Sequence, residues 1–366
     1  MSSIRSSDWI PHSKPTLTEA DAAAVGDAIR TGYVGSGPLV KTFEAQVAGR
    51  LDRSFSRATT TGSAALHLAL LAAGVRPGDP VLLPAFVCRA VLNVVLACGG
   101  KPVLVDIDPM TLCITADAVR SACTRAGIAK SMSVALVLVH SFGVAVDVDE
   151  FQSLGLKIIE DAASSFGASF DGRPVGSNGI ISVLSFASTK MMTTGQGGMI
   201  LTSNEECAER IEALMDYDCA SKPSHGDQRI AYNYGLAEVP ASLGISQLSR
   251  LDDFVARRRE IAGRYVEALR GFTGVTLPRA IDGRGYYRFI LLSDDAQNVV
   301  QRLRAVDIDA RSSVSHFLHD YLDSPGQVPN CEAIRSRIVS LPIFPSLTAG
   351  EVERVASSAR AAIQGS

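Results

Sequence analysis

The sequence predicts an α/β protein: a large domain with a mostly parallel central sheet covered by helices, followed by a smaller C-terminal α+β domain. From about residue 16 to about residue 205, short apolar runs alternate with helical patterns, which is typical of strands buried on both faces of a sheet. Near residue 243 this alternation gives way to one long helical pattern. The length of 366 residues and a hydrophobic content of 46% suit two such lobes.

The first helix is expected to start after Thr16 or Thr18, either of which can cap it, and a second should run from Pro38 to Leu51. A β-like run from Ala58 then enters a helix through Leu70. The buried strands expected after it are Pro80 to Leu83, Pro102 to Val105, Val134 to Val139, Lys157 to Ile159, Ser182 to Phe186 and Met199 to Leu201.

The pattern from Leu243 to Leu269 predicts one long helix that bridges the two lobes, so we place the large domain at residues 13–250 and the small domain at 251–366. Arg257 to Arg259 are expected to form a solvated helix face rather than a phosphate clamp for a nucleotide, since consecutive residues point in different directions. The small domain should contain a strand from Tyr287 to Leu292 and helices at residues 298–305 and 349–363.

Composition restricts the function classes. A net charge of -3 gives no general attraction for nucleic acid or an anionic membrane. The seven cysteines are scattered and form no CxxC pair, which argues against a disulfide framework and against a metal site. No secretory signal opens the chain, and no apolar run is long enough to span a bilayer. We therefore expect a cytoplasmic protein with no nucleic-acid or membrane partner.

Lys190 carries the strongest chemical signal. It follows an apolar strand and a run of small residues, and a glycine-rich turn at Gly195–Gly198 comes after it. Most lysines are solvated surface charges, but a lysine in this setting is partly desolvated, and its neutral amine can attack an aldehyde.

Two further signals precede it. Asp161 ends a hydrophobic strand and could hold a pyridine nitrogen in its protonated state, whereas Glu160 should face the other way because side chains alternate along a strand. The helix that opens at Thr61–Gly62–Ser63 could bind a phosphate through its free N–H groups. Each signal alone fits a strand-end cap or an ordinary N-cap, but together they supply an anion site, a pyridinium partner and a carbonyl-capturing amine.

With these motifs the chain resembles the DegT/StrS family of pyridoxal-phosphate (PLP)-dependent nucleotide-sugar aminotransferases. The resemblance covers almost the whole chain and rests on many ordered matches. They include Gly32–Pro38, Thr61–His67, Gly78–Val81, Pro84–Phe86, Val105–Asp108, Val139–Gly143, Glu160–Ala163, Ser185–Phe186 with Lys190, Gly195–Gly198, Tyr232–Tyr234 and Leu341–Leu347.

The family implies a fold-type I PLP-dependent transferase that forms a homodimer with shared active sites. By position, Lys190 matches the Schiff-base lysine and Asp161 the pyridinium partner. The other matches to cofactor-binding positions are Gly62, Ser63 and Ala64 at the phosphate, Phe86 and Ala163 at the ring, Ser164, Ser185, and Asn233, which reaches the phosphate in the neighbouring subunit. His316 and Tyr33 are candidates for contact with the substrate, and His319 is a weaker one.

Four positions depart from the family pattern. Cys88 stands where many members place an aromatic residue that stacks on the cofactor, and Phe86 could partly substitute for it. Ser164 replaces a common Gln or His, Gln196 a common acid, and Gly235 a frequent Arg. These departures leave the cofactor lysine intact but put the substrate in doubt.

The resemblance implies a transaminase that passes an amino group from an amino acid, glutamate, through pyridoxamine phosphate to a nucleotide-linked keto-sugar. Such amino sugars serve cell-surface polysaccharides or secondary metabolites. Two alternatives stay open: a cyclitol or other non-nucleotide ketone as acceptor, and a regulatory homologue without catalysis. Residues 215–232 and 311–330 are expected to shape the substrate pocket.

Overall fold

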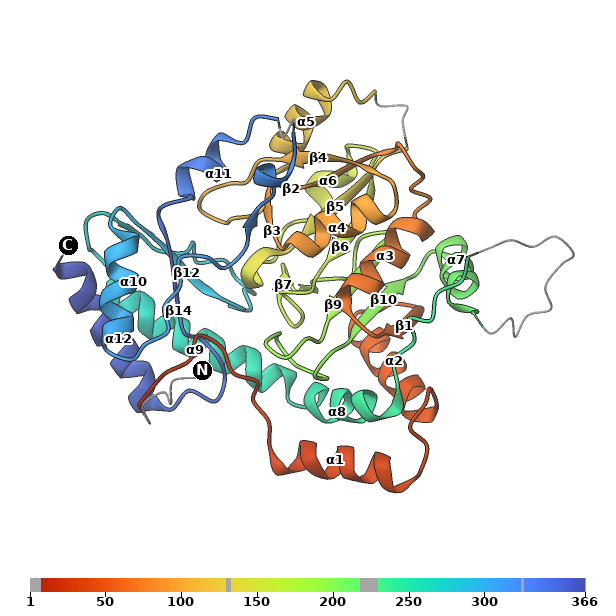
Figure 1. Ribbon diagram of the computed structural model, residues 1–366, viewed down its shortest axis with the longest axis horizontal. Helices are drawn as coiled ribbons and strands as arrows, with labels where there is room; N and C mark the ends of the chain where they lie inside the picture. The colour runs from red at the N-terminus through yellow and green to blue at the C-terminus, as the bar shows by residue number, and fades with distance from the viewer. Residues whose placement is uncertain (1–7, 130–132, 218–229, 324–325, 366) are drawn as a thin grey trace, which may run out of the picture.

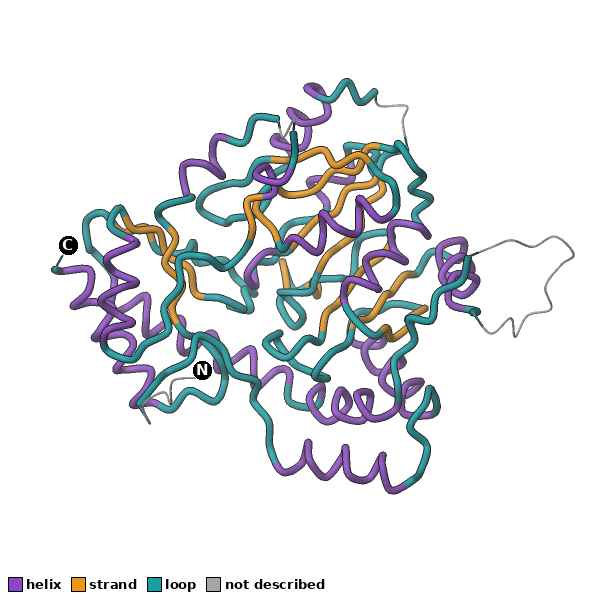
Figure 2. Tube along the Cα trace, viewed as in Figure 1, coloured by secondary structure: helices purple, strands orange, loops and turns teal. Residues whose placement is uncertain are grey.

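The computed structural model describes residues 8–129, 133–217, 230–323 and 326–365. A seven-stranded sheet occupies the centre of the molecule, and a three-stranded sheet lies to one side of it beside the C-terminal helices (Figures 1 and 2). The α/β prediction is therefore confirmed.

The central sheet has the strand order β1-β10-β9-β6-β5-β2-β4; β10 is antiparallel to β1 and β9, and the other pairs are parallel. Every buried strand expected from the sequence is present. The strands are β1 (Phe55–Thr59), β2 (Pro80–Pro84), β4 (Lys101–Val105), β5 (Ala135–Val139), β6 (Lys157–Asp161), β9 (Ile181–Ser185) and β10 (Gly198–Thr202).

Helices cover both faces of this sheet, because alternate strand residues enter different apolar clusters. Val183 and Ile200 pack in the cluster that contains α3 and α4, whereas Leu184 and Met199 pack in the one that contains α2 and α8. The helices of this region are α1 (Glu19–Arg30), α2 (Pro38–Arg50), α3 (Gly62–Ala72), α4 (Arg89–Ala97), α5 (Ala116–Arg125), α6 (Asp149–Gln152), α7 (Glu205–Met215) and α8 (Glu238–Leu248), with a 3-10 turn η1 (Ser141–Gly143).

The long bridging helix predicted at residues 243–269 is wrong as a single element. Helix α8 ends at Leu248, and α9 (Leu251–Leu269) starts a new axis after a turn in which Arg250 has non-helical φ/ψ angles. Asp21 of α1 binds Ser246 and Gln247 at the end of α8 and Arg250 in the turn, at 2.7, 3.0 and 2.6 Å. These contacts hold α8 against α1 while α9 runs on toward the smaller sheet.

The smaller sheet has the order β11-β12-β14 and packs against α9 and two further helices. Ile10 joins this cluster through a bridge to Ile308, so the start of the described chain lies against its C-terminal part. The elements are β11 (Val275–Thr276), β12 (Phe289–Ser293), α10 (Ala296–Ala305), β14 (Ile338–Leu341) and α12 (Ala349–Gln364), whereas α11 (Pro329–Ile334) packs in the cluster of the central sheet. The domain boundary at residue 250 stays a prediction.

Arg258 corrects a second expectation. It is 3% exposed, and its guanidinium donates to the carbonyl oxygen of Ile343 at 2.9 Å, so the Arg257–Arg259 run is not a uniformly solvated face. The carbonyl partner comes from a distant part of the chain, which a reading of the helix alone does not reveal.

Two small antiparallel pairs are also present: β3 (Phe86–Val87) with the distant β13 (His316–Phe317), and the local hairpin β7 (Ser169–Phe170) with β8 (Arg173–Pro174). The first pair, followed by the 3-10 turn η2 (Leu318–Tyr321), places a C-terminal segment beside the central sheet. Among the described helices none is long and apolar enough to cross a bilayer.

Candidate active site

A cavity of about 380 Å³ lies at the carboxyl ends of the parallel strands β6 and β9. This is where open parallel sheets bind their ligands. Most of the site residues expected from the sequence line this one cavity. They are Gly62, Ser63, Phe86, Cys88, Asp161, Ala163, Ser164, Ser185 and Lys190.

One end of the cavity is formed by the start of α3. Thr61 caps the helix by accepting a hydrogen bond from the Ala64 N–H at 3.0 Å, so Ala64 is less available to a phosphate than expected. The N–H groups of Gly62 and Ser63 have no acceptor among the described residues and belong to the first turn, where the helix dipole favours an anion.

Glycines bring this helix start close to the strand that carries Ser185. A Cβ atom on Gly62 would lie 2.7 Å from the Cβ of Ser185, and one on Gly198 would lie 2.5 Å from the carbonyl oxygen of Thr61. The absence of these two Cβ atoms therefore lets backbone N–H groups and the Ser185 hydroxyl surround the same small volume.

Asp161 occupies the end of β6 and is 7% exposed. Its Oδ1 accepts a hydrogen bond from the Ala163 N–H at 2.9 Å. Burial raises the pKa of this carboxyl group, and the Ala163 N–H, Lys190 and His140 only partly oppose the rise. A cationic N–H group placed against Asp161 would stabilise its ionised form.

Glu160 points away from the cavity, as the alternation of the strand predicts. Its carboxylate is fully buried and accepts hydrogen bonds from the Gly176, Asn178 and Gly179 N–H groups and from His140 Nε2, the last at 3.1 Å. Burial would raise the pKa of Glu160, but these donors outweigh it and hold the pKa at about 2. Glu160 thus anchors the strand end that presents Asp161.

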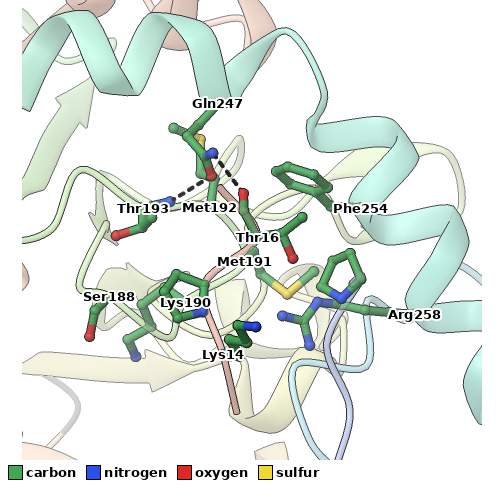
Figure 3. A pocket seen from close by; sticks show the side chains of 12 residues that line it. Lys14, Thr16, Ser188, Lys190, Met191, Met192, Thr193, Gln247, Phe254 and Arg258 are labelled. Atoms are coloured by element: carbon green, nitrogen blue, oxygen red, sulfur yellow. Dashed lines mark hydrogen bonds between the residues drawn. The ribbon is translucent and has the colours of Figure 1, made fainter. Parts of the chain in front are cut away.

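Lys190 lies in the turn after β9 and reaches the same cavity. Its Nζ donates to the Ser164 hydroxyl at 3.4 Å and lies 5.0 Å from the ring centre of Tyr287. Lys190 also borders a second, much smaller hollow of about 10 Å³, which Lys14 and Arg258 line as well (Figure 3).

The sequence reading missed several residues that line the cavity, above all Tyr287. Tyr287 precedes a strand of the smaller sheet, so no local motif connects it with Lys190. Ser141 and Phe142 also line the cavity, and Phe142 has a left-handed backbone with φ 56°. Phe142 follows β5, and in the sequence it was noted only as part of the family match Val139–Gly143, with no role assigned to it.

Other predicted residues do not reach the cavity in this chain. Asn233 is exposed, Tyr33 is 56% exposed, and His316 lies beside the cavity, with Val314 and Ser315 lining it instead. Gln196 and Cys88 are among the lining residues, whereas Gly235 pairs with Thr59. Residues 218–229 and 324–325 of the expected substrate loops lie outside the described part of the chain.

The residues present fit pyridoxal phosphate. The cavity volume lies within the range of small-molecule sites. Free helix N–H groups and the Ser185 hydroxyl suit a phosphate, Asp161 suits the pyridine nitrogen, and Lys190 suits the aldehyde. Ala163, Phe86 and Phe142 give the apolar walls that a flat ring needs.

Known proteins similar to this chain are aminotransferases. The DegT/DnrJ/EryC1/StrS aminotransferase family matches residues 15–360. The aminotransferase TlmJ from Streptoalloteichus hindustanus has 29% identity and a TM-score of 0.87, with 98% of this chain and 99% of that one covered. The sugar aminotransferase CalS13 from Micromonospora echinospora has 26% identity and a TM-score of 0.86, with 96% and 99% covered.

Structures of lower sequence identity share the same fold. PseC from Helicobacter pylori, an aminotransferase of pseudoaminic acid biosynthesis, has 20% identity and a TM-score of 0.88, with 98% and 100% covered. A similar Streptococcus pneumoniae structure is in its PLP form. The expectations of a fold-type I architecture and of PLP are thereby confirmed. The chain belongs to the DegT/DnrJ/EryC1/StrS aminotransferase family and is a PLP-dependent aminotransferase.

Proposed function

We propose that this aminotransferase moves an amino group from glutamate to the ketone of a nucleotide-linked deoxysugar. The observation that carries the proposal is the meeting of Lys190, Asp161 and the start of α3 at one cavity. An amine, an acid and an anion site arranged in this way match the aldehyde, the pyridine nitrogen and the phosphate of the cofactor. The similarity to the sugar aminotransferase CalS13 supports a sugar as the class of acceptor.

Each residue has a proposed task. Lys190 would hold the cofactor through its aldehyde, and its freed amine would take the α-proton of the amino acid and later return a proton. Asp161 keeps the pyridine nitrogen protonated. Gly62, Ser63 and Ser185 bind the phosphate. When bound, the cofactor supplies the electron sink that makes the α-proton removable.

The test uses the purified chain loaded with PLP. Adding glutamate should convert the cofactor to its amine form, and a panel of nucleotide keto-sugars should then return it to the aldehyde form. The cofactor's absorption follows both steps. A Lys190→Ala variant with normal turnover would overturn the proposal.

The alternatives have distinct outcomes in the same assay. Turnover with scyllo-inosose in place of nucleotide keto-sugars would favour a cyclitol acceptor. No conversion with glutamate or other amino acids would favour a regulatory homologue. The retained Lys190, Asp161 and phosphate site rank that last possibility below the two enzymatic ones.

We further propose a homodimer in which Asn233 serves the partner's phosphate site. Asn233 is exposed and lies outside the cavity of its own chain, which fits a role across an interface. Mixing inactive Lys190→Ala and Asn233→Ala chains should restore activity, because half of the mixed dimers' sites would be intact. A monomer in sedimentation, or no restoration after subunit exchange, would contradict this arrangement.

A further inference from the structure

Lys190 borders two spaces, and a displaced lysine must stay on the correct side. One space is the large cavity. The other is the hollow of about 10 Å³ between Lys190, Lys14 and Arg258 (Figure 3), which has room for one water-sized group. The side chain is long and flexible, so its surroundings decide where the amine rests.

Tyr287 faces Lys190 on the cavity side. It is 9% exposed, lines the cavity, and its ring centre lies 5.0 Å from Lys190 Nζ, within the range of a cation–π contact. The guanidinium of Arg288 lies 4.3 Å from the same ring centre and donates to the Tyr287 hydroxyl at 3.1 Å. Arg288 thus holds the ring in place, and the ring can also attract the charged amine of Lys190.

The hollow side repels a positive charge. Lys14 and Arg258 line it, and no carboxylate is among its lining residues. Burial and the nearby Arg288 together lower the pKa of Arg258 to about 9. An ammonium group on Lys190 is therefore attracted to the Tyr287 ring and repelled from the hollow.

Main-chain contacts fix the position of Tyr287. The Gly285 N–H donates to the carbonyl oxygen of Gly143 at 2.7 Å. A Cβ atom on Gly143 would lie 2.4 Å from the nitrogen of Tyr286, so the two segments touch backbone to backbone. These contacts hold the main chain that carries Tyr287 against the turn after β5.

We propose that Tyr287 is a positioning residue whose ring face keeps the Lys190 amine on the cavity side, ready to bond the cofactor aldehyde. The inference rests on the proposed role of Lys190. The ring face is the acting part; the hydroxyl serves to hold the ring against Arg288. Burial alone would raise the pKa of Tyr287, but the nearby Lys190 and Arg288 help to lower it below its usual value.

The experiment separates covalent capture from binding. Capture begins when the Lys190 ammonium releases one proton to solvent. The neutral amine then joins the aldehyde carbon of PLP by a C=N bond, and its two hydrogens leave with the aldehyde oxygen as water. Pyridoxamine phosphate has an amine in place of the aldehyde and can only bind. Stopped-flow absorbance gives the capture rate in cofactor-free protein, and calorimetry gives the Kd of pyridoxamine phosphate.

Tyr287→Leu is expected to slow capture about tenfold, with the Kd of pyridoxamine phosphate changed less than about twofold, since a desolvated cation–π contact is of that order. Tyr287→Phe keeps the ring and should stay within about twofold of the wild-type rate. The matched control is Tyr286→Leu, at the neighbouring tyrosine, which stacks near Phe289 and does not line the cavity.

Three results would overturn the inference: an unchanged capture rate in Tyr287→Leu, equal losses of capture and of pyridoxamine phosphate affinity, or a Tyr287→Phe variant as slow as Tyr287→Leu. If the wild-type chain itself captured no PLP, the proposed function would fail instead. The Tyr286→Leu control shows whether any loss arises from damage to the segment as a whole.

Discussion

Substituting Gly62 by alanine should weaken the binding of pyridoxal phosphate without unfolding the protein. The new Cβ atom would lie 2.7 Å from the Cβ of Ser185, whereas ordinary contacts of this kind begin at 3.4 Å. The start of α3 and the end of β9 must therefore separate by about 0.7 Å, the difference between these two distances. Both segments contribute to the expected phosphate site.

The size of the effect follows from hydrogen-bond geometry. A phosphate contact near 2.8 Å that lengthens by such an amount reaches about 3.5 Å, where it no longer counts as a hydrogen bond. A bond to a charged group contributes about 1.5–3 kcal/mol. Loss of one such bond should raise the Kd of the cofactor about tenfold to a hundredfold.

Titrating cofactor-free protein with PLP, followed by absorbance, measures that change. Gly263→Ala is the matched control, because a Cβ atom there meets nothing within 4 Å in the middle of α9, and we expect wild-type affinity. A Gly62→Ala variant with the affinity of the control would refute the placement of the phosphate at the start of α3.

Three further predictions concern the other side chains of the site. Lys190→Ala should lose about a hundredfold to ten-thousandfold in turnover and should show no cofactor mass after hydride reduction, while pyridoxamine phosphate still binds. Asp161→Asn should stabilise the cofactor-free protein to heat at neutral pH but not at acidic pH: a raised carboxyl pKa means that stability is present while the acid is protonated and is lost as pH rises through the folded pKa. A variant that melts at the same temperature as the wild-type chain at both pH values would contradict this. Glu160→Ala should cost about 3–5 kcal/mol in urea unfolding, because it leaves His140 and the loop N–H groups without their acceptor. The stability that Glu160 provides should be present above its unfolded pKa and fall as pH drops toward its folded value of about 2.

The parts of the site that the sequence predicted are those whose signal is local. Asp161 ends a strand, Lys190 follows one, and Ser63 opens a helix, so the ordering rules of parallel sheets bring them together. Tyr287 could not be found this way, because it comes from the chain leading into the smaller sheet, and only packing against Gly143 brings it to the cavity.

The errors have the same origin. Apolar periodicity continues across residues 248–251, so no local pattern marks the turn that Asp21 stabilises from another helix. The burial of Arg258 likewise depends on a carbonyl oxygen at Ile343. Long-range polar partners, rather than local propensity, decided both cases.

The backbone contact between Gly143 and residues 285–287 also bears on how this enzyme can diverge. The contact is made by main-chain atoms, so most side-chain substitutions should leave it unchanged. We therefore expect variation in the segment around His316, the candidate for contact with the acceptor, to alter which acceptor fits while Tyr287 stays beside Lys190. New substrate preferences should accumulate in that segment, and replacement of Gly143 should be tolerated least, whatever sugar the descendant uses.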